Sequence, residues 1–111
     1  MMPVKESGAM TIILDSSHQI YYYHGLLDNA KGLMQLQTTN FKSIRSIIMD
    51  KKLNTEVQKL MFIVKSRNKS TYGDNIDILD EMSICEIPSG HYVEGELDGK
   101  EEKLLGLLKD K

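Results

Sequence analysis

The sequence predicts a small two-layer α+β domain, in which helices pack on one face of a mixed β-sheet in the order ββαβαβα. Short apolar runs that suit strands alternate with two segments whose apolar residues fall on one face of a helix. Such helices can bury their apolar stripes only against a common sheet. The length of 111 residues allows one domain with a single core.

Residues 11–24 predict a β-hairpin. Thr11–Asp15 is a short apolar strand, Gln19–His24 is rich in β-favouring residues, and the three residues between them are polar. The tyrosines of the second strand, Tyr21, Tyr22 and Tyr23, must lie on both of its faces. We therefore expect at least one buried ring and another that is exposed or at a contact surface.

Residues 25–40 have no clean period and are interpreted as a long loop with one turn of helix. Asn40 is positioned to cap a helix that follows it. The apolar residues of this helix fall on one face, and they are Phe41, Ile44, Ile47 and Ile48.

Leu60–Val64 is a five-residue apolar run flanked by charge, which favours a strand at the centre of the sheet. Three cations, Lys65, Arg67 and Lys69, alternate along the extended segment that follows, so they point to one side. They form either a small patch that binds an anion or a partner, or a charged strand exit that prevents aggregation.

Thr71 and Asp74 have the spacing of a capping box, which predicts the start of a second helix. Its apolar stripe consists of Tyr72, Ile76, Leu79 and Met82. Its acidic residues lie largely outside this stripe, and they are Asp74, Asp77, Asp80 and Glu81. The expected core of the domain is Phe41, Ile44, Ile48, Phe62, Tyr72, Ile76 and Leu79.

After a turn at Pro88–Gly90, His91–Leu97 predicts one more strand, weakened by Gly95 and two glutamates. Asp98 and Glu101 repeat the capping-box spacing. The leucines that follow suit a short amphipathic helix, and they are Leu104, Leu105, Leu107 and Leu108.

Composition excludes several classes of protein. Apolar residues make up 41% and charged residues 27% of the chain, which are globular values that exclude wholesale disorder. The net charge of −2 argues against general affinity for nucleic acid, which needs a surplus of cations. The single cysteine, Cys85, can form neither an internal disulfide nor a cysteine-based zinc site, and we expect a buried packing thiol.

The pattern of reactive residues predicts no enzymatic activity and no bound cofactor or metal. The three histidines, His18, His24 and His91, have no second ligand at helical spacing, and no glycine-rich phosphate loop occurs. The acidic helix is best explained as a solvated face. The alternative is a stand-alone small enzyme or ligand-binding domain that uses Asp77 and Asp80.

The stretch from Met61 to Cys85 resembles the ExbD/TolR family, and within it the ExbD-like biopolymer transport proteins of the Bacteroidetes type. In that family an apolar strand ends in lysine and is followed by a polar turn, Thr-Tyr, and a helix with the pattern V/I-D-I-L-D-E-M. The matching residues are Thr71-Tyr72 and Ile76-Asp77-Ile78-Leu79-Asp80-Glu81-Met82. With the front of the chain, the resemblance covers residues 2–85. After Cys85 the family continues into an apolar strand, whereas this chain has Pro88-Ser89-Gly90.

The resemblance implies the periplasmic domain of an inner-membrane energy transducer of the ExbB–ExbD–TonB or TolQ–TolR type. Such complexes use the proton motive force to drive work at the outer membrane of Gram-negative bacteria. The family's membrane helix carries the aspartate that takes part in proton translocation. We expect residues 1–9 to be a flexible lead-in after that missing helix, and residues 10–111 to form the periplasmic domain.

The implied function is binding rather than catalysis. The implied partners are ExbB/TolQ-like and TonB/TolA-like proteins and a second copy of the chain in a homodimer. We expect contacts at exposed strand edges, with the hairpin edge open and the terminal strand guarded by Glu94 and Glu96. The candidate contact residues are Tyr21, Tyr22, Tyr23, Lys65, Arg67 and Lys69.

Overall fold

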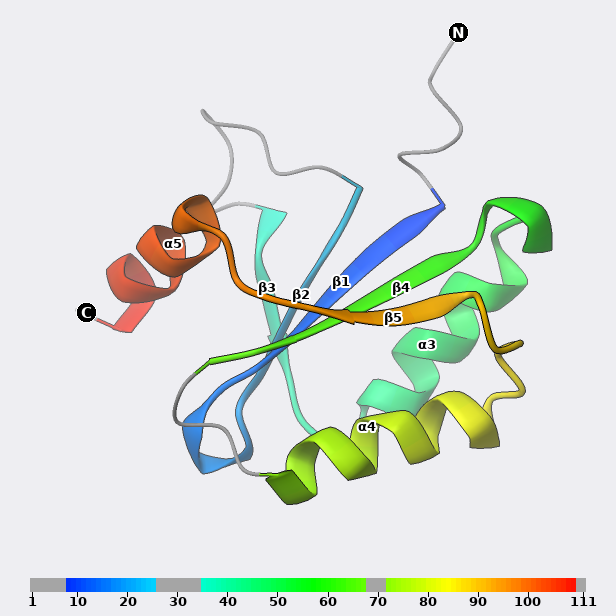
Figure 1. The fold of residues 1–111 in the computed structure, drawn as a ribbon, viewed down its shortest axis with the longest axis horizontal. Helices are drawn as coiled ribbons and strands as arrows, with labels where there is room; N and C mark the ends of the chain where they lie inside the picture. The colour runs from blue at the N-terminus through cyan, green and yellow to red at the C-terminus, as the bar shows by residue number, and fades with distance from the viewer. Residues whose placement is uncertain (1–7, 26–34, 68–71, 110–111) are drawn as a thin grey trace, which may run out of the picture.

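The computed structural model describes residues 8–25, 35–67 and 72–109, which form a five-stranded mixed sheet with three α-helices (Figure 1). The strands are β1 (Ala9–Leu14), β2 (Ile20–His24), β3 (Gln37–Thr39), β4 (Met61–Ser66) and β5 (Tyr92–Gly95). The helices are α3 (Ile44–Leu53), α4 (Tyr72–Ile84) and α5 (Gly99–Lys109). The predicted α+β fold with a small mixed sheet is confirmed.

The strand order is β3-β2-β1-β4-β5, so the centre of the sheet is β1 and not the predicted β4. β1 pairs antiparallel with β2, as the predicted hairpin requires, and parallel with β4. All but the first residue of β1 are buried because both faces are covered, whereas burial alternates along β4. The additional strand, β3, replaces part of the predicted loop. Its sequence, Gln-Thr-Thr, has no apolar residue that could have marked it as a strand.

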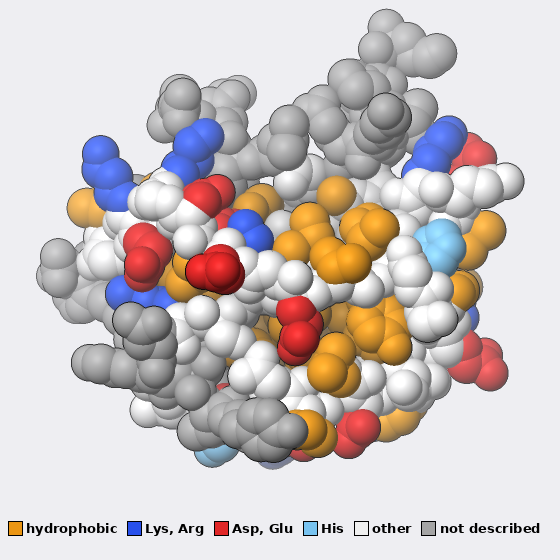
Figure 2. Space-filling view, in the orientation of Figure 1, with side chains coloured by type: hydrophobic (Ala, Val, Ile, Leu, Met, Phe, Trp, Pro, Cys, Tyr) orange, Lys and Arg blue, Asp and Glu red, His pale blue; other side chains and the backbone are white. Residues whose placement is uncertain are grey.

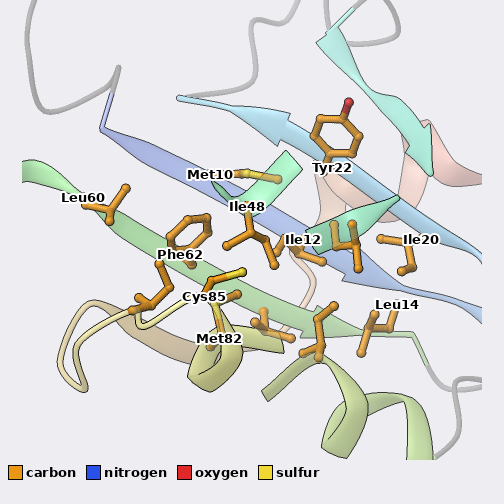
Figure 3. Packing of buried hydrophobic residues seen from close by; sticks show 14 residues of the cluster. Met10, Ile12, Leu14, Ile20, Tyr22, Ile48, Leu60, Phe62, Met82 and Cys85 are labelled. Carbon is orange, nitrogen blue, oxygen red and sulfur yellow. The ribbon is translucent and has the colours of Figure 1, made fainter. Parts of the chain in front are cut away.

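One face of the sheet is covered by α3 and α4, and the larger part of the core lies between them (Figure 3). This core consists of Met10, Ile12, Leu14, Ile20, Tyr22, Ile44, Ile48, Leu60, Phe62, Val64, Ile78, Met82, Cys85 and Ile87. Cys85 is buried as predicted, and burial raises the pKa of its thiol. Arg45 of α3 donates to Glu81 of α4 at 2.8 Å, which links the two helices.

The predicted cap at Asn40 is wrong for α3, because the N-cap of this helix is Ser43, which makes no side-chain cap hydrogen bond. The Asn40 carboxamide oxygen instead accepts from the backbone N–H groups of Lys42 and Ser43, each at 3.0 Å, in the turn before the helix. The predicted stripe of α4 is wrong at Ile76, which is 41% exposed. Ile78, which the predicted stripe lacks, is fully buried, and Met82 is fully buried as predicted. Leu79 and Phe41 are partly buried against the core, while Thr71 and the side chain of Tyr72 lie outside the described residues.

The opposite face of the sheet is covered by α5, so the prediction that all helices share one face is wrong for this helix (Figure 1). A second apolar cluster lies beneath it, made of Ile13, Tyr21, Tyr23, Leu36 and Leu105, with Leu97 and Leu104 at its border. Alternate side chains of a strand point to opposite faces, so a strand that is apolar at successive positions, like β1, needs cover on both. The leucines of α5 provide the second cover.

Gly8 lies where a side chain has no room. A Cβ atom at this position would overlap the backbone carbonyl oxygen of Lys59, and the Gly8 carbonyl accepts from Met61 N–H at 2.9 Å. We expect Gly8→Ala to lower the free energy of unfolding by about 1–3 kcal/mol in urea titrations, because backbone must move. Gly106 of α5 has open space around it, so Gly106→Ala is expected to raise stability by about 0.5–1 kcal/mol. Equal effects of the two substitutions would contradict this assignment.

Candidate functional site

The open edge of the sheet at β5 is the first candidate binding surface. Among the described strands, β5 has a neighbour on one side only, β4. Backbone groups of a strand in a parallel pair face the neighbour at alternate residues. Because the His91 carbonyl accepts from Phe62 N–H at 2.9 Å, the N–H and C=O groups of Tyr92 and Glu94 face away from β4. This edge therefore presents two donors and two acceptors to an added strand.

The side chains along this edge are apolar on one face and acidic on the other. Val93 is 47% exposed and lies beside the half-buried Ile63 on the α5 face of the sheet. Glu94 is exposed on the opposite face, and Glu96 follows it. Figure 2 shows hydrophobic side chains gathered where Figure 1 places β5, with an acidic side chain among them. The edge therefore suits an extended segment that alternates basic and apolar residues.

The hairpin edge that the sequence predicts as open is covered. β2 lies between β1 and β3 and pairs with both. The tyrosine run is correspondingly buried, with exposed fractions of 6% for Tyr21, 9% for Tyr22 and 6% for Tyr23. The prediction of an exposed tyrosine is therefore wrong, and these three rings are core residues.

The described cations at the end of β4, Lys65 and Arg67, are engaged within the chain. Lys65 Nζ donates to both carboxylate oxygens of Glu101, at 2.7 and 2.9 Å. Arg67 forms ion pairs with Asp15 at 3.3 Å and with Glu102 at 3.7 Å. Lys65 and Arg67 thus point to one side, as their alternation predicts, and both reach glutamates of α5, so they do not form a free patch. Lys69 lies outside the described residues.

A buried polar triad, Tyr23–Glu101–Lys65, joins α5 to the sheet. The Glu101 side chain is fully buried, and it accepts from the Tyr23 hydroxyl at 2.6 Å in addition to Lys65. The Asp98 N–H also donates to Glu101 at 2.9 Å, and the Asp98 carboxylate accepts from Glu101 N–H at 2.8 Å. The predicted capping box is thereby confirmed. Burial, and then the hydrogen bond to Glu101, raise the pKa of Tyr23 well above its usual value.

A second polar pair, which the sequence did not reveal, lies at the start of α4. His18 Nδ1 lies 2.6 Å from Asp74 Oδ1, and the Asp74 side chain is 3% exposed while His18 is 70% exposed. Ser17 and His18 both adopt left-handed backbone conformations, with φ of 59° and 60°, which direct the imidazole back to the helix. A carboxylate that orients an imidazole is an arrangement used for proton transfer.

The acids of the alternative enzymatic interpretation lie elsewhere. Asp77 and Asp80 are exposed on α4, and Asp74 is the member of the acidic set that contacts a histidine. In the described part of the chain, no three His, Cys, Asp or Glu side chains converge to hold a metal ion.

A hollow of about 320 Å³ lies between the end of β2 and the C-terminal half of α3. Tyr22, His24 and Lys51 contribute to its lining. Burial lowers the pKa of Lys51, and burial together with the charge of Lys51 lowers the pKa of His24. The carbonyl groups at the C-terminal end of α3 make this region electronegative and favour a positive charge. Lys51 supplies that charge.

No protein-family model, curated protein or solved structure matches this chain. Among the described residues, none of the helices has the length and apolar character to cross a bilayer. Within the described part of the chain, no strand pairs with the outer side of β5, whereas Lys65 and Tyr23 on the α5 face are already hydrogen-bonded to Glu101.

Proposed function

We propose that this chain is a partner-binding domain of the ExbD/TolR type, the periplasmic part of an inner-membrane energy transducer driven by the proton motive force. The observation that carries the proposal is the open edge of β5, with its outward backbone groups at Tyr92 and Glu94. An extended partner segment adds there as a sixth strand, its backbone supplying affinity and its side chains specificity.

The segment that resembles the family supports this proposal through its place in the fold. It forms β4 and α4, so the strand of the resemblance is the neighbour of β5. The matched acids Asp77 and Asp80 are exposed on α4 and are free to meet a partner surface without disturbing the core.

The side chains of the β5 edge restrict the sequence of a partner segment that can bind there. A residue beside Val93 lies on the α5 face and contacts apolar surface, whereas a residue beside Glu94 lies on the other face and meets negative charge. A TonB/TolA-like protein with an extended basic-apolar stretch fits this role. An ExbB/TolQ-like partner meets the membrane helix that the resemblance implies. The same edge can pair antiparallel with β5 of a second copy, which gives a homodimer.

Replacing Glu94 with proline tests the strand-addition mode. The N–H that proline removes faces away from β4, so the sheet is expected to keep its fold. We expect an extended TonB-like periplasmic peptide to bind roughly tenfold more weakly to Glu94→Pro, since one backbone hydrogen bond is lost and the ring blocks the edge. Affinity is measured by isothermal titration calorimetry, and the site by backbone amide chemical-shift mapping.

Glu94→Gln is the matched control, because it removes the charge and keeps the N–H. We expect Glu94→Gln to weaken the binding of a basic peptide by only a few-fold, with a stronger effect at low salt. For the unmodified chain, shifts are expected at residues 92–95 and their neighbours in β4. Shifts confined to the segment after Leu97, or equal affinity of Glu94→Pro and Glu94→Gln, would count against strand addition at β5.

A further inference from the structure

The neighbouring parallel strands β4 and β5 are followed by helices on opposite faces of the sheet. α4 comes after β4 and packs on one face, whereas α5 comes after β5 and packs on the other (Figure 1). Where the connections after two such strands diverge, they leave a crevice between the strand ends. In open sheets with parallel strands, ligands bind at this point, outside the carboxyl ends of the strands.

The structure has a hollow of about 340 Å³ at this position. It lies between the last residues of the two strands, Ser66 and Gly95, and the first turn of α5. Its volume is at the small end of the range for ligand sites, roughly 300–1,000 Å³, so it suits a small molecule. The lining residues are Ser66, Arg67, Gly95, Glu96, Leu97 and Glu102.

Arg67 is positioned to bind a carboxylate in this hollow. Among the described residues that line it, Arg67 is the one cation, and its side chain is 24% exposed. Its Nη1 donates to the buried carboxylate of Asp15 at 3.3 Å, which anchors the guanidinium at the end of β4. Its Nε lies 3.7 Å from Glu102 Oε1, an ion pair longer than a hydrogen bond. Because the Glu102 side chain is 56% exposed, it can turn into water and leave this position to a ligand carboxylate.

The acids of the hollow determine what else the ligand must carry. Glu96 and Glu102 both line the hollow and are exposed. These two carboxylates repel a simple anion that approaches Arg67. A ligand that carries an ammonium group beside its carboxylate pairs with both kinds of charge. Leu97 is half-buried at the border of the apolar cluster beneath α5 and offers an apolar contact.

We propose that this hollow binds a small zwitterion of the α-amino acid type. The ligand carboxylate binds Arg67, its ammonium group binds Glu102 and Glu96, and its apolar side chain contacts Leu97. The ligand thereby replaces one long ion pair with two shorter ones. This site lies beyond the end of β5, so it is separate from the outward backbone groups at Tyr92 and Glu94.

Three probes of similar size test the charge pattern of the ligand. They are L-leucine, leucinamide, which lacks the carboxylate, and 4-methylpentanoate, which lacks the ammonium group. In backbone amide chemical-shift titrations of the full chain, we expect L-leucine to shift residues 66–67, 95–97 and 102. We also expect it to bind at least about tenfold more tightly than either analogue, since each analogue loses one charge-assisted contact. If L-leucine leaves these amides unshifted, or binds no more tightly than 4-methylpentanoate, the proposal is overturned.

Two variants assign the charges of the ligand to residues of the hollow. Arg67→Lys keeps a cation beside Asp15 but loses the planar fork, so we expect it to bind L-leucine about tenfold more weakly. Glu96→Gln combined with Glu102→Gln removes two exposed acids. We expect this double variant to prefer 4-methylpentanoate over L-leucine, because the anion is no longer repelled and the ammonium group has lost its partners. An unchanged preference contradicts the assignment.

Asp77→Asn combined with Asp80→Asn is the matched control, because it changes the net charge by the same amount on the exposed face of α4. We expect it to bind L-leucine as the parent chain does, and an equal loss in both double variants overturns the proposal. Circular dichroism establishes that each variant is folded. Glu94→Pro is expected to retain L-leucine binding, so failure of this site and failure of peptide binding at β5 are distinguishable.

Discussion

Lys65→Met is expected to lower the free energy of unfolding by about 3–5 kcal/mol at neutral pH, because it leaves the Glu101 carboxylate buried with its cation removed. The remaining hydrogen bonds, from Tyr23 and from Asp98 N–H, are neutral and cannot replace that charge. Methionine keeps the length and the apolar stem of the side chain, so loss of packing contributes little. Urea unfolding monitored by circular dichroism gives the difference.

A triple variant separates the lost charge pair from other causes. Lys65→Met combined with Glu101→Leu and Tyr23→Phe removes all three polar groups together, and buried polar clusters replaced by apolar groups of similar volume are often neutral or stabilising. We expect this variant to regain most of the stability that Lys65→Met loses. If the free energy of unfolding of Lys65→Met lies within about 1 kcal/mol of that of the parent chain, the triad is not a strong constraint on α5.

Ile78→Ala is expected to lower the free energy of unfolding by about 2–5 kcal/mol, because Ile78 is fully buried between α4 and the sheet and its truncation leaves a cavity. Ile76 is the matched control, since it has the same side chain on the same helix and is 41% exposed. We expect Ile76→Ala to change stability by less than about 0.5 kcal/mol in the same urea titrations. A larger effect at Ile76 than at Ile78 would restore the stripe that the sequence predicts.

The phase of α4 shows where periodicity stops being informative. Met82 has helical spacing both from Leu79, which is three residues after Ile76, and from Ile78, so the apolar pattern supports two stripes that share Met82. Asp74, one turn before Ile78, is also buried, and its carboxylate meets His18 from the hairpin turn. That contact joins residues far apart in the sequence, which no local pattern encodes.

The hairpin, the strand after residue 60 and the capping box of α5 were predictable because each depends on neighbours in the sequence. The burial of the tyrosines beneath α5 was not predictable in this way. Lys65 and Glu101 meet only because β5 returns the chain to the same sheet and α5 crosses to its other face. The sequence therefore identified Lys65 and Tyr23 as contact residues. It did not show that their contact is with Glu101 of the same chain.

The β5 edge could be predicted only in part. The glutamates of the terminal strand marked it as an edge, and it is one. The other expected edge, at β2, is occupied by β3, whose polar residues pair through their backbone and leave no trace in an apolar pattern.

The two neighbours of β1 differ in their distance along the chain, and this sets the order in which the domain folds. Tyr21 pairs with Ile13 across a short turn, whereas Val64 must find Ile12 after all of β2, β3 and α3 have been synthesised and brought together. Hairpins close within microseconds, whereas a distant parallel pairing carries the entropy cost of a long loop before any ladder contact repays it. We therefore expect docking of β4 against β1 to be slower than closure of the hairpin, and until it occurs β1 has an unpaired apolar edge.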